Sequence, residues 1–150
     1  MSDPKTILVL CTGNSARSIM AEAYLNHIGQ GLWRAVSAGS QPTGRVNPFA
    51  LTTLISAGIP APSAARSKSW HEFSRPGSPP IDVVLTVCDN AANETCPHFP
   101  GSAQKIHIGF PDPAATDGSD AAKAESFRAV FAAMRPKLDA LVADLNRGPG

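Results

Sequence analysis

A chain of 150 residues has the size of one domain, and its formal net charge of +1 gives no reason to expect nucleic acid or an acidic membrane surface as a partner. Hydrophobic residues make up 43% of the sequence and charged residues 17%, which is typical of a globular protein and excludes a disordered one. No apolar run approaches the roughly 20 residues of a membrane-spanning helix, and the run from Thr6 to Cys11 is too short for a signal peptide. We expect one monomeric domain over residues 1–150, located in the cytoplasm.

The first half of the chain alternates strand and helix. Residues 6–10 form a continuous apolar run of strand length, typical of a parallel sheet that is buried on both faces. Apolar residues at helical spacing predict a helix over 18–28, and a second strand follows at 33–37. Asn47-Pro48 is typical of a helix start and Gly58 of a helix end, which predicts a second helix between them.

The second half begins with a stretch, 60–80, that is rich in Pro, Ser and Ala. Within it only residues 68–73 indicate a short turn of helix. The clearest strand of the chain is predicted at 81–87, and a shorter one at 105–109. A long amphipathic helix is predicted over 121–145 from its apolar stripe.

This alternation predicts an α/β fold in which a four-stranded parallel sheet is flanked by helices on both faces. We find no internal repeat and no linker that would divide the chain. Sheets of this kind bind ligands at the carboxyl ends of their strands, and Cys11 directly follows the first strand.

The segment between the first strand and the first helix reads Cys11-Thr-Gly-Asn-Ser-Ala-Arg17-Ser18. Small residues allow the backbone N–H groups of such a loop to surround a tetrahedral oxyanion, and the following helix adds its positive N-terminus. The planar guanidinium of Arg17 suits the paired oxygens of phosphate or its analogues. The expected oxyanion-binding residues are Thr12, Gly13, Asn14, Ser15, Ala16, Arg17 and Ser18.

Two interpretations of Cys11 follow from this position. The N–H groups, the helix end and Arg17 favour the thiolate, so we expect the pKa of Cys11 to be lowered. A thiolate beneath a bound oxyanion is a nucleophile aimed at the central atom, and Ser18 is placed to hydrogen-bond the sulfur. The other interpretation is a small apolar residue at the end of a buried strand. The strand before Cys11 and the helix after it favour the catalytic interpretation.

Several further motifs occur along the chain. They are I-M-A-E-A directly after the loop, S-A-G-S at residues 37–40, N-P-F-A, R-S-K-S-W, V-L-T-V-C-D-N-A and F-P-D-P-A. With C-T-G-N-S-A-R-S they span essentially the whole chain, which resembles the low-molecular-weight protein tyrosine phosphatase superfamily, particularly its arsenate reductase branch. The resemblance implies the α/β fold of that superfamily and nucleophilic chemistry at Cys11.

The resemblance also implies roles for residues near the loop. Asp112 matches a general acid that protonates the leaving oxygen, whereas without the resemblance it would be read as an Asx turn before proline. Asn14 matches an asparagine that supports the loop by hydrogen-bonding a serine after the second strand, here Ser37. Asparagine is also one of the few residues that tolerate a left-handed backbone.

We expect neither a metal nor a tightly bound cofactor. Some relatives bind potassium beside the position of Glu22, but the further acidic ligand of that site has no match around residues 67–70. Arg66 and Lys68 could steer an oxyanion towards the loop, although exposed charges are the commoner explanation.

Two features separate a reductase from a phosphatase. Phosphatases of this superfamily carry aromatic residues after the Asp-Pro pair, where this chain has Ala114 and Ala115. Cys88 ends the third main strand, at the same edge of the sheet as Cys11, and Cys96 follows it. The resemblance implies that Cys11 attacks arsenate, that Cys88 attacks Cys11 and releases arsenite, and that Cys96 then takes over the disulfide.

The resemblance further implies an external thiol reductant, thioredoxin first, with glutaredoxin and glutathione, or mycothiol, as alternatives. Phosphate and sulfate are expected to compete with arsenate. If the residues between Cys88 and Cys96 were helical, the two Cα atoms would be roughly 12 Å apart, whereas a disulfide needs about 7 Å or less. That segment must then rearrange during turnover.

Two other functions stay open at this stage. One is a phosphatase for phosphotyrosine or small phosphomonoesters that uses Cys11, Arg17 and Asp112. The other is a binding module that senses an oxyanion or a redox state without catalysis.

Overall fold

The structure of the chain is a computed structural model, which describes residues 5–29, 31–60, 67–74, 77–78, 80–88, 104–113 and 117–146. Its elements in chain order are β1 (Lys5–Leu10), α1 (Arg17–Gly29), β2 (Trp33–Ala38), α2 (Pro48–Ser56), the 3₁₀ helix η1 (Trp70–Phe73), β3 (Val83–Thr86), β4 (Gln104–His107) and α4 (Asp120–Asn146).

The four strands form one parallel sheet in the order β2-β1-β3-β4. Leu10, the last residue of β1, pairs with Ala38 of β2 and with Thr86 of β3, so these three strands end at the same level. The central strand β1 is buried from Thr6 to Leu10 because helices and loops cover both faces of the sheet. The predicted parallel sheet is confirmed, and residue 11 lies at its carboxyl edge.

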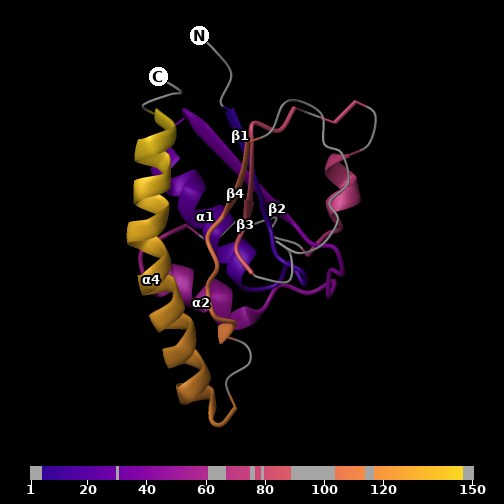
Figure 1. The fold of residues 1–150 in the computed structure, drawn as a ribbon. Coiled ribbons are helices and arrows are strands. Elements are labelled where there is room, and N and C mark those ends of the chain that lie inside the picture. The colour runs from indigo at the N-terminus through magenta and orange to yellow at the C-terminus, as the bar shows by residue number, and fades with distance from the viewer. Residues whose placement is uncertain are drawn as a thin grey trace.

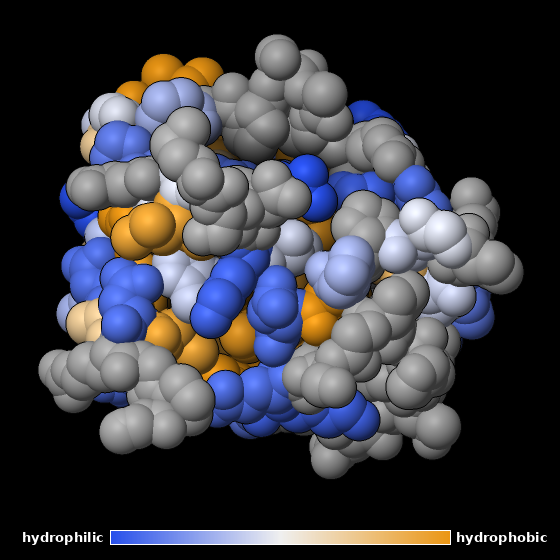
Figure 2. Space-filling model, turned by 90° about the horizontal axis from the view of Figure 1, so that it is seen from above, coloured by the Kyte–Doolittle hydropathy of each residue, from blue (hydrophilic) through white to orange (hydrophobic). Residues whose placement is uncertain are grey.

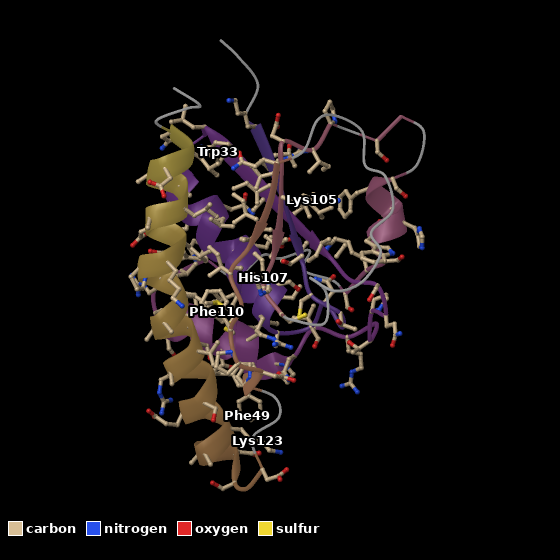
Figure 3. All side chains as sticks on the ribbon, in the orientation of Figure 1. Trp33, Phe49, Lys105, His107, Phe110 and Lys123 are labelled. Carbon is tan, nitrogen blue, oxygen red and sulfur yellow. The ribbon has the colours of Figure 1, made fainter. Side chains whose placement is uncertain are left out.

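Helices α1 and α4 cover one face of the sheet, and η1 lies on the other (Figure 1). The stripe of α4 that faces the core includes Phe127, Met134 and Leu138, which are almost completely buried. Helix α2 packs on α4, where the ring centroids of Phe49 and Phe127 are 5.5 Å apart (Figure 3). The predicted α/β layers are therefore present, with η1 as the described helix on the second face.

Within the described ranges, the predicted and observed elements differ only near their ends. The strand predicted at 81–87 is shorter in the structure, Val83–Thr86. Backbone hydrogen bonds nevertheless continue on both sides of it, from Asp82 N to Thr6 O and from Val87 N to Leu10 O, each 3.0 Å. The short helical turn predicted at 68–73 begins later, at Trp70, because Ser69 caps it by accepting a hydrogen bond from His71 N–H.

Figure 2 shows the end of the molecule at which the strands begin, where apolar surface alternates with hydrophilic side chains. A groove of about 850 Å³ lies at this end, between the sheet and α4. Lys5, Trp33 and Gln104, all at strand starts, are among the residues that line it. From there the groove extends along β4 as far as Ile108. Among the helices in the described part of the chain, none has the length and apolarity needed to cross a membrane.

Candidate active site

The loop after β1 is shaped by hydrogen bonds to its carbonyl groups. Residues 41–47, which follow β2, run beside the loop and donate backbone N–H groups to it. These bonds run from Gln41 to Thr12 O (3.0 Å), from Thr43 to Gly13 O (3.1 Å) and from Asn47 to Ser15 O (2.8 Å). These bonds engage three carbonyl oxygens of the loop, and a loop whose carbonyl groups are held in this way can offer N–H groups to an oxyanion.

Gly39, the residue after β2, is part of this arrangement and was not among the predicted site residues. A Cβ atom at position 39 would lie 2.4 Å from the carbonyl oxygen of Thr12 and 2.5 Å from that of Cys11. Only glycine lets β2 continue this close to the loop. The signal in the sequence was a glycine directly after a strand, in S-A-G-S, but its neighbour across the sheet could not be read from it.

Asn14 supports the loop as the sequence predicts. Its backbone is left-handed, with φ of 46°, and its side chain is completely buried. The side-chain Nδ2 donates to Ser37 Oγ at 3.0 Å, which is the predicted hydrogen bond, and also to Ser18 Oγ at 2.8 Å. The hydrogen bond expected from Ser18 to the Cys11 sulfur stays a prediction.

Cys11 and Cys88 lie side by side although they are far apart in the sequence. Both are buried. The N–H of Thr12 donates to Cys88 Sγ at 3.4 Å, and the Thr12 hydroxyl is 3.7 Å from the same sulfur. The level ends of β1 and β3 explain this contact, because each cysteine follows its strand closely.

The pKa of Cys11 differs from the sequence-based expectation. A hydrogen bond with the Cys88 side chain, followed by burial, raises the pKa of the Cys11 thiol. Arg17 and the backbone N–H of Gly13 lower it, as predicted, but with smaller effect. The expectation of a lowered pKa is wrong for this arrangement because it left the Cys88 thiol out of account.

Arg17 connects the loop to the segment after β4. Its guanidinium donates to the carbonyl oxygen of Phe110 at 3.0 Å, and Nη2 lies 3.9 Å from Asp112 Oδ2. Phe110 itself is buried between α4 and the carboxyl end of the sheet (Figure 3). Asp112 therefore lies at the same edge as Cys11, with about half of its side chain exposed, where it can meet solvent and a bound ligand.

Lys68 is not the exposed charge that the sequence indicated. Its side chain is 11% exposed, and its ammonium lies 4.0 Å from Glu22 Oε1 on α1. The backbone around it is held against the loop, since Lys68 N donates to Asn14 Oδ1 at 2.8 Å and Ser67 Oγ donates to Gly13 O at 3.0 Å. Contacts between such distant segments are not visible in a local charge pattern.

Some predicted residues lie outside the described residues, namely Cys96, Arg66, Ala114 and Ala115. The distance between Cys88 and Cys96 is therefore not part of the structure. Within the described ranges, no group of three His, Cys, Asp or Glu side chains could hold a metal ion. The structure thus brings together Cys11, Cys88, Arg17 and Asp112.

The chain is similar to known proteins in sequence and in structure. The model of the low molecular weight phosphotyrosine protein phosphatase family matches residues 6–149. An arsenate reductase of Halalkalibacterium halodurans is 36% identical over 126 residues, covering 84% of this chain and 86% of that protein. One of Bacillus licheniformis is 38% identical over 128 residues, with 84% and 86% covered. The crystal structure of an arsenate reductase from Archaeoglobus fulgidus has a TM-score of 0.69 and 27% identity, over 91% of this chain and 98% of that one.

Proposed function

The chain belongs to the low molecular weight phosphotyrosine protein phosphatase family, and from this premise we propose that it reduces arsenate to arsenite. The observation that carries the proposal is the second thiol beside the nucleophile. Cys88 Sγ accepts a hydrogen bond from Thr12 N–H and contacts Cys11 at the base of the oxyanion loop. Hydrolysis of a phosphate ester needs one thiol there, whereas a two-electron reduction needs a pair.

The first step uses the loop and the residues around it. Backbone N–H groups of the loop and the Arg17 guanidinium bind arsenate, and Cys11 attacks the arsenic atom as a thiolate. A sulfur–arsenic bond forms, one oxygen leaves, and Asp112 supplies the proton that lets it leave as water. Asp112 lies 3.9 Å from Arg17, close enough to reach an oxygen that the guanidinium holds.

The second step transfers electrons. Cys88 attacks the sulfur of Cys11, the sulfur–arsenic bond breaks, and its electron pair stays on arsenic, which passes from As(V) to As(III). Two thiols and arsenate thus become a Cys11–Cys88 disulfide, arsenite and water. Both cysteines are buried at the same edge of the sheet, where the level ends of β1 and β3 bring them near each other.

Recycling requires a third thiol and an external reductant. Cys96 attacks Cys88, regenerates Cys11, and passes the disulfide to a position from which a dithiol protein of the thioredoxin class reduces it. Glutaredoxin with glutathione, or mycothiol, are the alternative reductants. Phosphate and sulfate share the tetrahedral shape of arsenate and compete with it in the loop. In this role the chain protects the cell against arsenate.

The second candidate function, hydrolysis of a phosphomonoester, uses Cys11, Arg17 and Asp112 without the other two cysteines. The contact between Cys11 and Cys88 favours the reductase, and slow phosphatase activity is expected as a side reaction of the same loop.

The test is arsenate-dependent oxidation of NADPH in the presence of thioredoxin and thioredoxin reductase. We expect turnover by the wild type and its loss in Cys11→Ser, Cys88→Ser and Cys96→Ser. Hydrolysis of p-nitrophenyl phosphate is the control, since Cys11→Ser should abolish it while Cys88→Ser should retain it. Arsenate turnover at the wild-type rate by Cys88→Ser would refute the proposed relay. Brisk phosphatase activity without arsenate reduction would assign the chain to the second function.

A further inference from the structure

A charged pair lies directly behind the oxyanion loop. Glu22 of α1 is 8% exposed, and the ammonium of Lys68 is 4.0 Å from its Oε1 atom. The same Oε1 accepts a hydrogen bond from Ser37 Oγ at 2.9 Å. A carboxylate this far from water is costly unless a cation and hydrogen bonds compensate it, and Lys68 supplies the cation.

The pair sets the direction of the hydrogen bonds that reach the loop. A hydroxyl has one proton, and Ser37 gives its proton to Glu22. The oxygen of Ser37 is then left to accept, and it accepts from Asn14 Nδ2 at 3.0 Å. If Glu22 took up a proton, it could donate to Ser37, and the direction of the hydrogen bonds at Ser37 would no longer be determined. An ionised Glu22 therefore fixes how Asn14 is held.

The backbone of Lys68 acts on the same residue from the other side. Its N–H donates to Asn14 Oδ1 at 2.8 Å, and its carbonyl oxygen accepts from Gly39 N–H at 2.9 Å. One residue thus contacts α1 through its side chain, and the loop and the end of β2 through its backbone. Asn14 needs such support, because its left-handed backbone is one that residues other than glycine rarely adopt.

We propose that Lys68 is a positioning residue for the oxyanion loop, whose charge keeps Glu22 ionised and thereby holds Ser37 and Asn14 in the order that directs the loop N–H groups to the oxyanion. This role of Lys68 deepens the proposed function, and the kinetic test of the role rests on that function. In this role Lys68 acts through Glu22, Ser37 and Asn14.

Three variants separate the charge from the bulk of the side chain. Lys68→Met keeps the length and removes the charge, Lys68→Arg keeps the charge, and Glu22→Gln combined with Lys68→Met removes both charges while an oxygen still accepts from Ser37. Lys105→Met, at an exposed lysine of β4, is the matched control. For each variant we measure kcat and KM for arsenate, and the affinity for inorganic phosphate from its protection of Cys11 against alkylation.

We expect Lys68→Met to lose roughly 10- to 100-fold in kcat/KM and to bind phosphate more weakly, because a misplaced loop weakens ground state and transition state alike. Lys68→Arg should restore most of the loss, the double variant should recover to within a few-fold of the wild type, and Lys105→Met should be unchanged. The midpoint of urea unfolding, measured in parallel, identifies a variant that fails for lack of stability. The alkylation of Lys68→Arg and of the double variant is compared only with that of Lys68→Met protein that is folded. A loss of the fold is therefore not mistaken for a loss of the charge.

Two results would overturn the proposal. One is phosphate affinity and kcat/KM of Lys68→Met equal to those of the wild type, and the other is a double variant as impaired as Lys68→Met. Failure of the wild type to reduce arsenate would refute the proposed function alone, since phosphate protection of Cys11 tests the role of Lys68 without turnover.

Discussion

The Cys11 thiol has two kinds of neighbour, which act on its pKa in opposite directions. The hydrogen bond with Cys88 and the loss of water around the sulfur raise the pKa, while Arg17 and the N–H of Gly13 lower it. The raising effects are larger. In this arrangement Cys88 therefore opposes formation of the Cys11 thiolate. The residue that completes the disulfide in the proposed relay is thus the same one that raises the pKa of the nucleophile.

This balance predicts that Cys88→Ala lowers the pKa of Cys11. Removing the thiol leaves Arg17 and the loop N–H groups with less opposition, so the thiolate should form at lower pH. The measurement is the pH dependence of Cys11 alkylation by iodoacetamide, followed by mass spectrometry in a Cys96→Ser background. At neutral pH the rate should rise by about tenfold for each unit by which the pKa falls. An unchanged pH profile would show that Cys88 does not control the thiol.

At Gly39 there is no space for a side chain. A Cβ atom there would meet the carbonyl oxygens of Thr12 and Cys11 at 2.4 and 2.5 Å, and backbone atoms cannot move away as a flexible side chain can. We predict that Gly39→Ala displaces the loop and weakens phosphate binding by roughly 10- to 100-fold. Isothermal titration with phosphate measures the change. Gly58→Ala is the control, because its positive φ of 77° is also strained by a side chain while open space surrounds it. If both variants bound phosphate equally well, the close approach would not matter for the loop.

At the scale of elements, the sequence predicts most of the fold because burial follows a regular period. The predicted helix 121–145 corresponds to α4, Asp120–Asn146, although Pro136 lies inside it. A proline in a helix removes one hydrogen bond and costs about 3 kcal/mol. The completely buried Met134 and Leu138, on either side of it, keep the helix on the sheet. The hydrophobic periodicity could not predict where strands end. At the end of β3, for example, backbone hydrogen bonds continue beyond the regular strand pairing.

The packing of α4 gives a stability prediction. Phe127 is 1% exposed and its ring lies against Phe49 of α2, so Phe127→Ala removes a large buried side chain. We expect the free energy of unfolding to fall by about 3–5 kcal/mol, measured by urea denaturation with an unchanged m-value. A double-mutant cycle with Phe49→Ala should give a coupling of about 0.5–1.5 kcal/mol for the ring pair. A loss below about 1 kcal/mol for Phe127→Ala would mean that α4 is not anchored at this residue.

At the scale of the whole molecule, the site is assembled from segments that only the sheet brings together. The sequence placed Cys11 and Cys88 at one edge because parallel strands end at the same side. The structure adds that β1 and β3 are neighbours in the sheet. The sequence could not place Lys68 behind Asn14, because that contact depends on the path of a segment without periodicity. Nor could it reveal that the carbonyl groups of the loop are held by residues 41–47. These are contacts between irregular segments, for which local patterns carry no signal.

Asp112 joins this assembly from the segment after β4, and its role gives a prediction about turnover. If it supplies the proton to the leaving oxygen, Asp112→Asn should lower kcat for arsenate by roughly 10²- to 10⁴-fold. The loop and Arg17 remain, so phosphate affinity should stay within a few-fold of the wild type. Single-turnover kinetics with arsenate measures the step itself, because in the proposed relay water is released before Cys88 attacks. Asp117→Asn, at an exposed residue a few positions along the chain, should turn over normally. Equal kcat values for Asp112→Asn and the wild type would assign the proton to another donor, whereas a parallel loss of phosphate affinity would mean that Asp112 holds Arg17 in place through their 3.9 Å contact.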